Sequence, residues 1–344
     1  MIVDTFQMAV QAYHKHAALH SLAHYTGILS MHAFARLALI TGNPAVLEES
    51  RRHLIPLVNG EIAFKANFSN YYVGGNGTAF LYWQGKLPEA QAALRRAAED
   101  TLVRAPRDDQ GIFRMPNQEQ HKIWIDVAFA VTPFLLFCGL AFQEDAYIEE
   151  AFQQTYKMVE ILRDPANELL HQARGFTAPG VISQDHWSRG NGWGILAMAE
   201  LVQYLPENDP RRPTAEEMFT RLTQACLKVQ DAQGVWHQEM TDATSYVETS
   251  GTGLILYALG VGLELGLLPA SVMSNYLNGL RGYSQYILPD GTVFHTCKGN
   301  LNPGNGTIAD YKQTPPVVND PHAFGPVTLA FGQALKLGIT DLVG

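Results

Sequence analysis

The sequence has few cysteines and no long apolar run, and each scarcity excludes a class of protein. Its three cysteines, Cys138, Cys226 and Cys297, are far apart and odd in number, so neither a disulfide framework nor a zinc site is expected. No stretch reaches the roughly 18 uninterrupted apolar residues of a membrane span. The first residues contain no basic segment followed by an apolar run, so no signal peptide is expected. These features predict a cytoplasmic protein with no membrane partner.

Basic residues are also scarce relative to acidic ones. The chain has 24 Lys and Arg against 33 Asp and Glu, which gives a formal net charge of −9 at pH 7. This balance argues against nucleic acid as a partner, so an anionic substrate would have to be met by local cations. Apolar residues make up 47% of the 344 residues. We therefore expect a large core and a single domain over residues 1–344.

Convincing strands are few, whereas helical periodicity is frequent. Apolar residues recur at helical spacing from Tyr25 to Ile40, and a Thr-Gly-Asn-Pro stop at 41–44 precedes a second helix at 45–58. The same helical hairpin recurs as 77–83 with 89–103, 123–140 with 145–162, 194–204 with 211–229 and 249–266 with 270–287, and 323–337 is expected to pair with 4–20. Six hairpins predict an all-α fold, a closed (α/α)6 barrel.

In such a barrel the first helix of each hairpin lines the centre, so the segments that precede these helices meet on one face. These segments are rich in His, Trp, Asp, Asn and Gly, and four of the five tryptophans lie in or beside them: Trp124, Trp187, Trp193 and Trp236. Aromatic rings stack on sugar rings, and loops on a rigid scaffold commonly carry binding groups. The pattern predicts a crater that binds a sugar.

Asp126 is the acid that best suits catalysis. It stands at the start of an otherwise apolar helix, two residues after Trp124 and five after His121. Burial among apolar groups disfavours a carboxylate and raises its pKa, as a general acid near neutral pH requires. The structural alternative is that Asp126 only stabilises the first helical turn.

Arg189 is the best anchor for an anion, because it lies within the run Trp187-Ser188-Arg189-Gly190-Asn191-Gly192-Trp193. A guanidinium pairs with a carboxylate through two parallel hydrogen bonds. Lys122, Arg174 and His171 are weaker candidates. The histidines at 14, 16, 20 and 24 lack the acid of a metalloprotease motif, and no phosphate-binding loop is present. The sequence therefore predicts neither a metal nor an organic cofactor.

Four motifs together resemble glycoside hydrolase family 105, the unsaturated rhamnogalacturonyl hydrolases, which are close to the unsaturated glucuronyl hydrolases of family 88. They are the run 187–193, His-Lys-Ile-Trp-Ile-Asp at 121–126, Ser-Tyr-Val-Glu-Thr-Ser at 245–250 and Asn-Asp-Pro at 319–321. The resemblance implies an (α/α)6 barrel that removes the terminal unsaturated uronic acid left on oligosaccharides by polysaccharide lyases.

The resemblance also implies roles for individual residues. Asp126 matches the general acid/base, which protonates C4 of the C4=C5 bond and activates a water for attack at C5. His171 matches a histidine near the double bond, and Trp187 and Arg189 match residues that hold the uronate. The remaining expected substrate-binding residues are His121, Trp124, Trp193, Glu248 and Trp236.

The sequence departs from the family pattern in two places, and these leave the substrate open. No acid occurs between Glu61 and Glu89, where the family has a second Asp, and Asn70 or Tyr71 falls near that position. No Asp follows His171 closely either, so Glu248 or Glu119 is a candidate for the missing role. One alternative is a β-glucuronidase-like hydrolase of saturated uronides, which would use Asp126 and Glu248 as a pair. A sugar epimerase centred on paired histidines and a non-catalytic carbohydrate-binding scaffold are the others.

Overall fold

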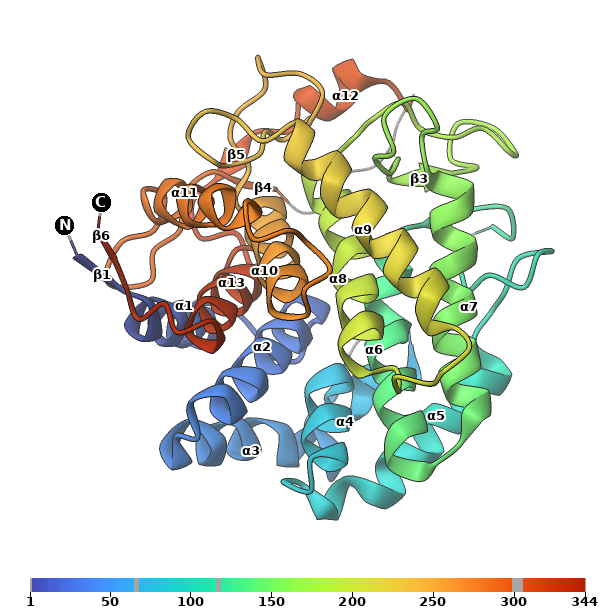
Figure 1. Cartoon of the computed structure of the whole chain (residues 1–344). Coiled ribbons are helices and arrows are strands. Elements are labelled where there is room, and N and C mark those ends of the chain that lie inside the picture. Colours follow the sequence, from blue (N-terminus) through green and yellow to red (C-terminus); the bar gives the residue numbers. More distant parts are fainter. Residues whose placement is uncertain (1, 65–67, 116–118, 299–305, 344) are drawn as a thin grey trace.

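Six helices form a closed inner ring in the computed structural model, which describes residues 2–64, 68–115, 119–298 and 306–343. Each inner helix packs on the next, and the last packs on the first (Figure 1). In ring order they are α2 (Tyr25–Thr41), α4 (Gly75–Trp83), α6 (Asp126–Phe142), α8 (Ser188–Tyr204), α10 (Thr249–Glu264) and α13 (Phe324–Lys336). The predicted all-α barrel is confirmed.

Six further helices lie outside this ring and complete the hairpins. They are α1 (Thr5–Leu19), α3 (Pro44–Val58), α5 (Gln91–Arg104), α7 (Asp145–Leu162), α9 (Arg212–Lys228) and α11 (Val272–Ser284). The two layers differ in their apolar pattern. In α6 every residue from Val127 to Gly139 is buried, whereas α7 buries only one face. A helix that is apolar all round belongs in the interior, and an amphipathic one belongs on the surface of the core.

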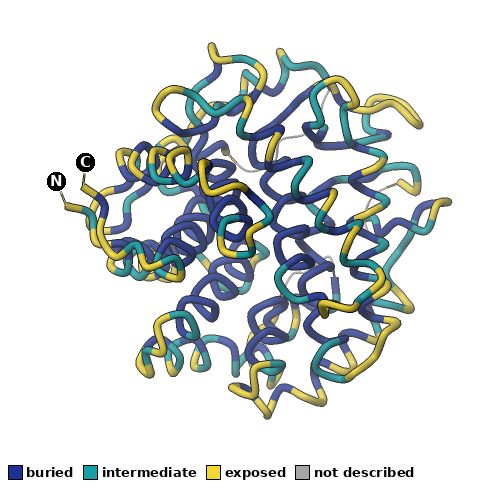
Figure 2. Tube along the Cα trace, viewed as in Figure 1, coloured by how far each residue is buried: buried dark blue, intermediate teal, exposed yellow. Residues whose placement is uncertain are grey.

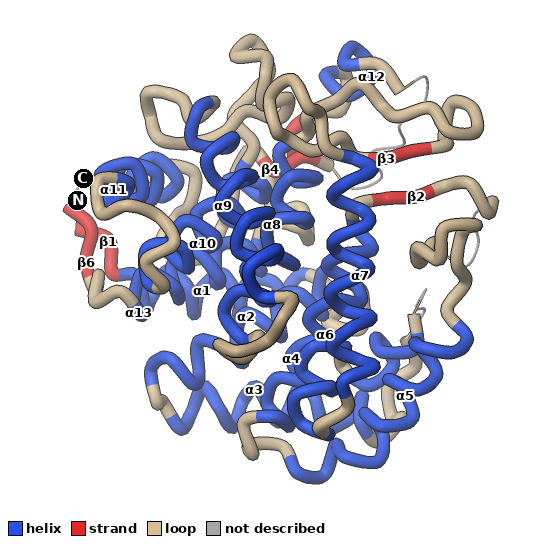
Figure 3. The backbone as a smooth tube through the Cα atoms, turned by 45° about the vertical axis from the view of Figure 1, so that its right-hand side comes forward, coloured by secondary structure: helices blue, strands red, loops and turns tan. Residues whose placement is uncertain are grey.

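The remaining elements are short. β1 (Ile2–Asp4) pairs antiparallel with β6 (Asp341–Val343), which brings the two ends of the chain together (Figure 1). β2 (Ile123–Trp124) pairs with β3 (Ala173–Arg174), and the two lie side by side in Figure 3. The others are β4 (Thr296–Cys297), β5 (Pro316–Val317), α12 (Ile308–Lys312) and the 3-10 helices η1 (Ser69–Val73) and η2 (Pro88–Ala90).

Two inner helices begin three or more residues away from the predicted start. The helix expected from Ile123 starts at Asp126, because Ile123 and Trp124 pair with β3 instead. The helix expected from Gly194 starts at Ser188, so the motif at 187–193 forms the first turns of α8. Its glycines allow close helix packing: a Cβ on Gly192 would lie 2.8 Å from a methyl carbon of Leu254 in α10.

The buried residues concentrate in the inner ring, and the exposed ones lie on the outer helices and loops (Figure 2). Among the described residues, no helix combines the length and the apolar character needed to cross a membrane. The three cysteines are buried and free. The segments before the inner helices meet at one end of the ring. His322 before α13 bonds to Tyr25 of α2, and Arg189 of α8 bonds to Ser250 of α10.

Candidate active site

Asp126 is the first residue of α6 and lies at this end of the ring. Its Oδ2 atom is buried and has no hydrogen-bonding partner among the described residues. Burial raises the pKa of its carboxyl to about 6, against the opposing effect of the Arg189 charge, and Asp185 adds to the rise. An uncompensated carboxyl of this kind is protonated in part near neutral pH, which suits a general acid. The N-terminal dipole of α6 is too weak to cancel the burial.

Arg189 is buried, and its guanidinium is largely engaged by the protein. Nη1 donates to Ser250 Oγ at 3.0 Å and to the Cys297 carbonyl at 2.7 Å, and Nη2 donates to the Lys298 carbonyl at 3.3 Å. Its Nε atom is buried and has no partner in the described part of the chain. The guanidinium carbon lies 4.3 Å from the centroid of the Trp187 ring. Trp187 is itself 2% exposed, so its ring packs against the Arg189 guanidinium and holds it in position.

Glu248 is committed to the protein. It caps α10 by accepting hydrogen bonds from the backbone N–H groups of Ser250 and Gly251. Its carboxylate also accepts from the Cys297 N–H and from the Ser188 and Ser250 hydroxyls. A carboxylate with this many donors is a structural acceptor, which accounts for its complete burial. It differs in this from Asp126.

Trp236 does not lie where the sequence analysis expected it. Its side chain has no exposed surface, and its indole N–H donates to the Cys226 carbonyl at 2.8 Å. The ring is part of the main core cluster. A ring enclosed in this way has no face left for a sugar, so the structure places Trp236 in the core.

Three other predicted residues, Trp193, Trp124 and His121, have different surroundings. Trp193 is buried, stacks on Phe129 at 4.8 Å between ring centroids and lowers the pKa of Asp126. Trp124 is half-buried and stacks on Phe176 at 5.1 Å. His121 Nε2 lies 3.3 Å from a carboxylate oxygen of Glu119. Phe176 was not predicted, because only the pairing of β2 with β3 brings it beside Trp124.

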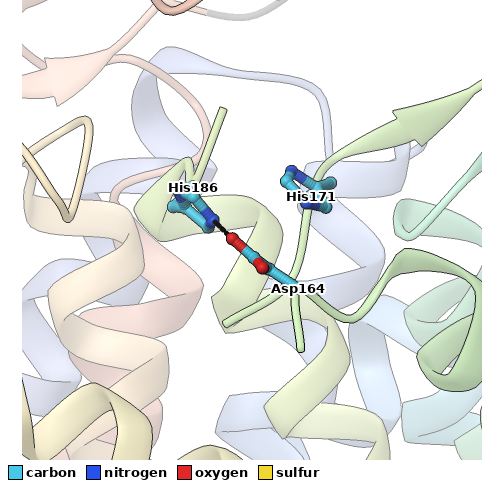
Figure 4. Close-up of side chains that lie close together, drawn as sticks. All are labelled: Asp164, His171 and His186. Atoms are coloured by element: carbon cyan, nitrogen blue, oxygen red, sulfur yellow. Dashed lines mark hydrogen bonds and ion pairs between the residues drawn. The ribbon is translucent and has the colours of Figure 1, made fainter. Parts of the chain in front are cut away.

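His171 faces a separate group of side chains (Figure 4). Its Nδ1 atom lies 2.9 Å from the Asp185 carbonyl oxygen, and its ring lies 4.9 Å from that of His186. His186 in turn lies 2.9 Å from Asp164 and 3.5 Å from Glu239. The structure thus brings His171 to the rim beside Asp185, in contact with His186 rather than with Asp126.

This Asp164–His171–His186 group has the donor set of a metal site. Asp164 and His186 Nε2, however, already have hydrogen-bonding partners. Burial opposes the charge on His186, but Glu239 and Asp164 outweigh burial and raise its pKa. A higher pKa favours the protonated imidazole, which has no lone pair for a metal. Asp164 also accepts from the backbone N–H of Ala166 and from Asn167. We read the group as an ion pair that fixes the loop before α8.

Asp185 is a buried acid that the sequence analysis missed. It accepts hydrogen bonds from the backbone N–H groups of Gln172 and Trp187 at 3.1 to 3.3 Å. Burial raises the pKa of its carboxyl. The Asp185 charge also raises the pKa of Asp126, because the two carboxylates repel each other. Its position directly before the motif at 186–193 was the available signal.

Comparison with known proteins shows the family of the chain. The family model described as Glycosyl Hydrolase Family 88 matches residues 2–337. The chain belongs to that family. The resemblance drawn from the four motifs is therefore confirmed, and the relatives of this family 88 protein are named as glycoside hydrolases.

Two curated relatives are similar to parts of the chain. An unsaturated rhamnogalacturonyl hydrolase, YesR, from Bacillus subtilis is 28% identical over 47% of this chain and 48% of its own length. An unsaturated 3S-rhamnoglycuronyl hydrolase from Formosa agariphila is 26% identical over 42% of this chain and 41% of its own length. The chain thus spans less than half the length of these relatives.

Solved structures show the same fold over nearly the whole chain. A family 105 glycoside hydrolase from C. acetobutylicum superposes with a TM-score of 0.82, covering 96% of this chain and 98% of its own. The identity is 23%, so this similarity establishes the architecture.

Proposed function

We propose that this protein removes the terminal 4,5-unsaturated uronic acid from lyase-generated oligosaccharides by hydrating the C4=C5 bond. The observation that carries the proposal is the state of Asp126, an acid with a raised pKa whose Oδ2 has no partner among the described residues. The family and the names of the curated relatives support the substrate class.

In the proposed reaction one carboxyl performs both proton transfers. Asp126 donates its proton to C4, and a water attacks C5. The carboxylate then accepts a proton from that water, which restores the acid. The resulting hemiketal opens, and the aglycone leaves. Since a single group donates and then accepts, the paired carboxylates of ordinary glycosidases are not needed.

Arg189 supplies the positive charge that the substrate carboxylate requires in a chain of net charge −9. The unpartnered Nε–H and the charge of the guanidinium make it the proposed uronate site, with Trp187 holding it in place. Trp124 and His121 are the proposed contacts to the sugar ring, and His171 is assigned to a place beside the double bond. Trp193, predicted as a further contact, is as enclosed as Trp236, so its proposed role is to act on the Asp126 carboxyl. Glu248 acts indirectly, by fixing the start of α10. The proposal assigns no substrate contact to Trp236 and no metal or cofactor.

The β-glucuronidase alternative is less well supported. It needs Asp126 and Glu248 as a working pair, but the Glu248 carboxylate is used by five donor groups of the protein. The epimerase alternative needs histidines on opposite faces of a ring, whereas His171 and His186 lie against each other. We also propose a cytoplasmic location, supported by three buried, unpaired thiols.

The test follows the ultraviolet absorbance of the conjugated enol-carboxylate. The protein is mixed with lyase products of pectin, of glycosaminoglycan and of ulvan type, with Asp126→Asn alongside. We expect the absorbance to decay with one class of oligosaccharide and the variant to be slower by about 10²–10⁴-fold. Release of a saturated uronate without any decay, or an Asp126→Asn variant as active as the parent, would overturn the proposal.

A further inference from the structure

Tyr25, His322 and Asp320 form a hydrogen-bonded chain that the hydration mechanism has not used. Tyr25 begins α2, and the other two precede α13, almost 300 residues later in the sequence. The Tyr25 hydroxyl bonds to His322 Nε2, and His322 Nδ1 lies 2.6 Å from Asp320 Oδ1. His322 and Asp320 are 4% and 7% exposed, so the chain is held in the protein rather than in solvent.

The direction of each hydrogen bond in this chain is fixed. Burial lowers the pKa of His322 to about 4, the Arg189 charge acts in the same sense, and the hydrogen bond to Asp320 does not offset them. The imidazole is therefore neutral near pH 7 and carries one proton. Because Asp320 accepts at Nδ1, the proton is on Nδ1 and Nε2 is an acceptor. The Tyr25 hydroxyl must donate to Nε2, so its oxygen presents only lone pairs to any other group.

Tyr25 lies within range of the Asp126 charge. Burial raises the pKa of the Tyr25 phenol, the Arg189 charge lowers it, and the charges of Asp126 and Asp320 raise it further. Asp126 also contributes to the raised pKa of Tyr71, the residue next to Asn70. Asn70 is buried and donates to the Ala130 carbonyl of α6, so it offers no carboxylate at the place where the family pattern has an acid.

The relative basicities of His322 and Asp126 decide whether a proton can pass along the Tyr25–His322–Asp320 hydrogen bonds. With a pKa of about 4, His322 is a weaker base than the Asp126 carboxylate, whose pKa is about 6. A proton from water therefore goes to Asp126 and not through Tyr25 to His322. The role left for Tyr25 is that of a rigid acceptor.

We propose that Tyr25 is a catalytic residue that accepts a hydrogen bond from the attacking water and so aims it at C5, with His322 and Asp320 as positioning residues. The Asp126 carboxylate takes one proton of the water, and the Tyr25 oxygen accepts a hydrogen bond from the O–H that is retained and becomes the hydroxyl on C5. The three hydrogen-bonded side chains thereby take the place of the second family acid, which is absent near position 70. No atom is transferred to Tyr25, so the balance of the reaction is that of the hydration itself. This inference rests on the proposed function.

Four variants test the proposal in the absorbance assay. Tyr25→Phe removes the acceptor. Asp320→Asn reverses the hydrogen bonds instead, because an amide that donates to Nδ1 moves the imidazole proton to Nε2. The Tyr25 hydroxyl then accepts from Nε2 and turns outward as a donor. His322→Leu removes the partner of the phenol, whereas His322→Gln keeps an acceptor near the position of Nε2. We expect the first three to lower kcat by about 10²-fold with KM changed less than about 5-fold, and His322→Gln to recover a large part of the loss.

The matched control is Tyr13→Phe. Tyr13 is a buried tyrosine of α1 whose hydroxyl lies 2.6 Å from His53 Nδ1, a Tyr–His pair outside the site. The kcat of Tyr13→Phe should equal that of the parent. Thermal unfolding of all five variants separates folding defects from catalytic ones.

The pH profile gives a readout that a structural role would not change. The groups facing His322 are Tyr25 of α2, His24 just before that helix, Arg189 of α8, His16 of α1 and Asp320 of its own loop. Protonation of His322 would turn Tyr25 into a donor, so kcat should fall below about pH 4 in the parent, and this limb should be absent from Tyr25→Phe.

The outcomes separate the two proposals. If the parent hydrates no unsaturated oligosaccharide, the proposed function fails. If the parent is active but Tyr25→Phe keeps the kcat of the parent, or changes only KM, the role of Tyr25 is refuted while the proposed function stands.

Discussion

Two buried carboxyl groups inside the same ring of helices differ in how completely the protein satisfies them. Glu200 of α8 accepts from Arg36 at 2.9 Å and from the Tyr257 hydroxyl at 2.9 Å, and lies 3.2 Å from His32. Asp126 leaves one oxygen without a partner among the described residues. Both are surrounded by aromatic rings and have an arginine nearby. The composition of the two sites is similar, and the number of hydrogen bonds distinguishes them.

The difference appears in the direction of the two pKa shifts. Burial works against both carboxylates, but Arg36, His32 and Tyr257 outweigh it and lower the pKa of Glu200. At Asp126 burial outweighs the Arg189 charge and raises the pKa, because the guanidinium N–H groups donate to Ser250 and two backbone carbonyls. A charged cluster that is fully paired holds helices together, and one that is left incomplete is available for chemistry.

The largest expected effect comes from breaking the paired cluster. Glu200→Gln leaves the Arg36 charge buried without its partner, so we expect a loss of about 3–5 kcal/mol in the free energy of unfolding. Asp126→Asn removes a charge that is already poorly solvated, so its stability should equal or exceed that of the parent. Chemical denaturation of the two variants measures the contrast. Equal losses would show that Asp126 is as structural as Glu200.

Glu248 sharpens the comparison, because it is a third buried carboxyl with many donors. Glu248→Gln weakens the cap of α10, and we expect a cost of about 1–2 kcal/mol in unfolding free energy. We expect kcat to stay within about 10-fold of the parent, since the variant acts through the start of α10 rather than on the substrate. Thermal unfolding and the absorbance assay are the measurements. Loss of all turnover in a well-folded variant would revive a two-carboxylate mechanism.

Two tryptophans provide the smallest effects. Trp236→Phe loses the hydrogen bond to Cys226 and should cost about 1 kcal/mol of stability without changing kcat. Trp193→Phe removes a group that favours the Asp126 carboxylate, so the pKa of Asp126 should rise further. The pH at which kcat/KM begins to fall would then move upward. A profile unchanged in Trp193→Phe, or a kcat effect in Trp236→Phe, would reverse the assignment of the two rings.

Periodicity predicted the architecture, because each hairpin is a local pattern of apolar residues and turns. Asp126 and Arg189 could also be singled out, since a charge in an apolar or glycine-rich run is conspicuous. The roles of Glu248 and Trp236 could not, because both depend on partners from other segments, such as Cys297. The contacts from Tyr25 to His322 and from Arg36 to Glu200 join residues separated by 297 and 164 positions. Only the closure of the ring creates them.

The most direct test of the central claim is the pH dependence of kcat/KM for loss of the enol-carboxylate absorbance. Asp126 must be protonated to donate to C4, and the protonated fraction falls tenfold per pH unit above its pKa. The account predicts a limb that falls above about pH 6. A rate that already falls as the pH rises above about 4, or no falling limb between pH 5 and 8, would contradict the assignment of Asp126 as the acid that drives the reaction.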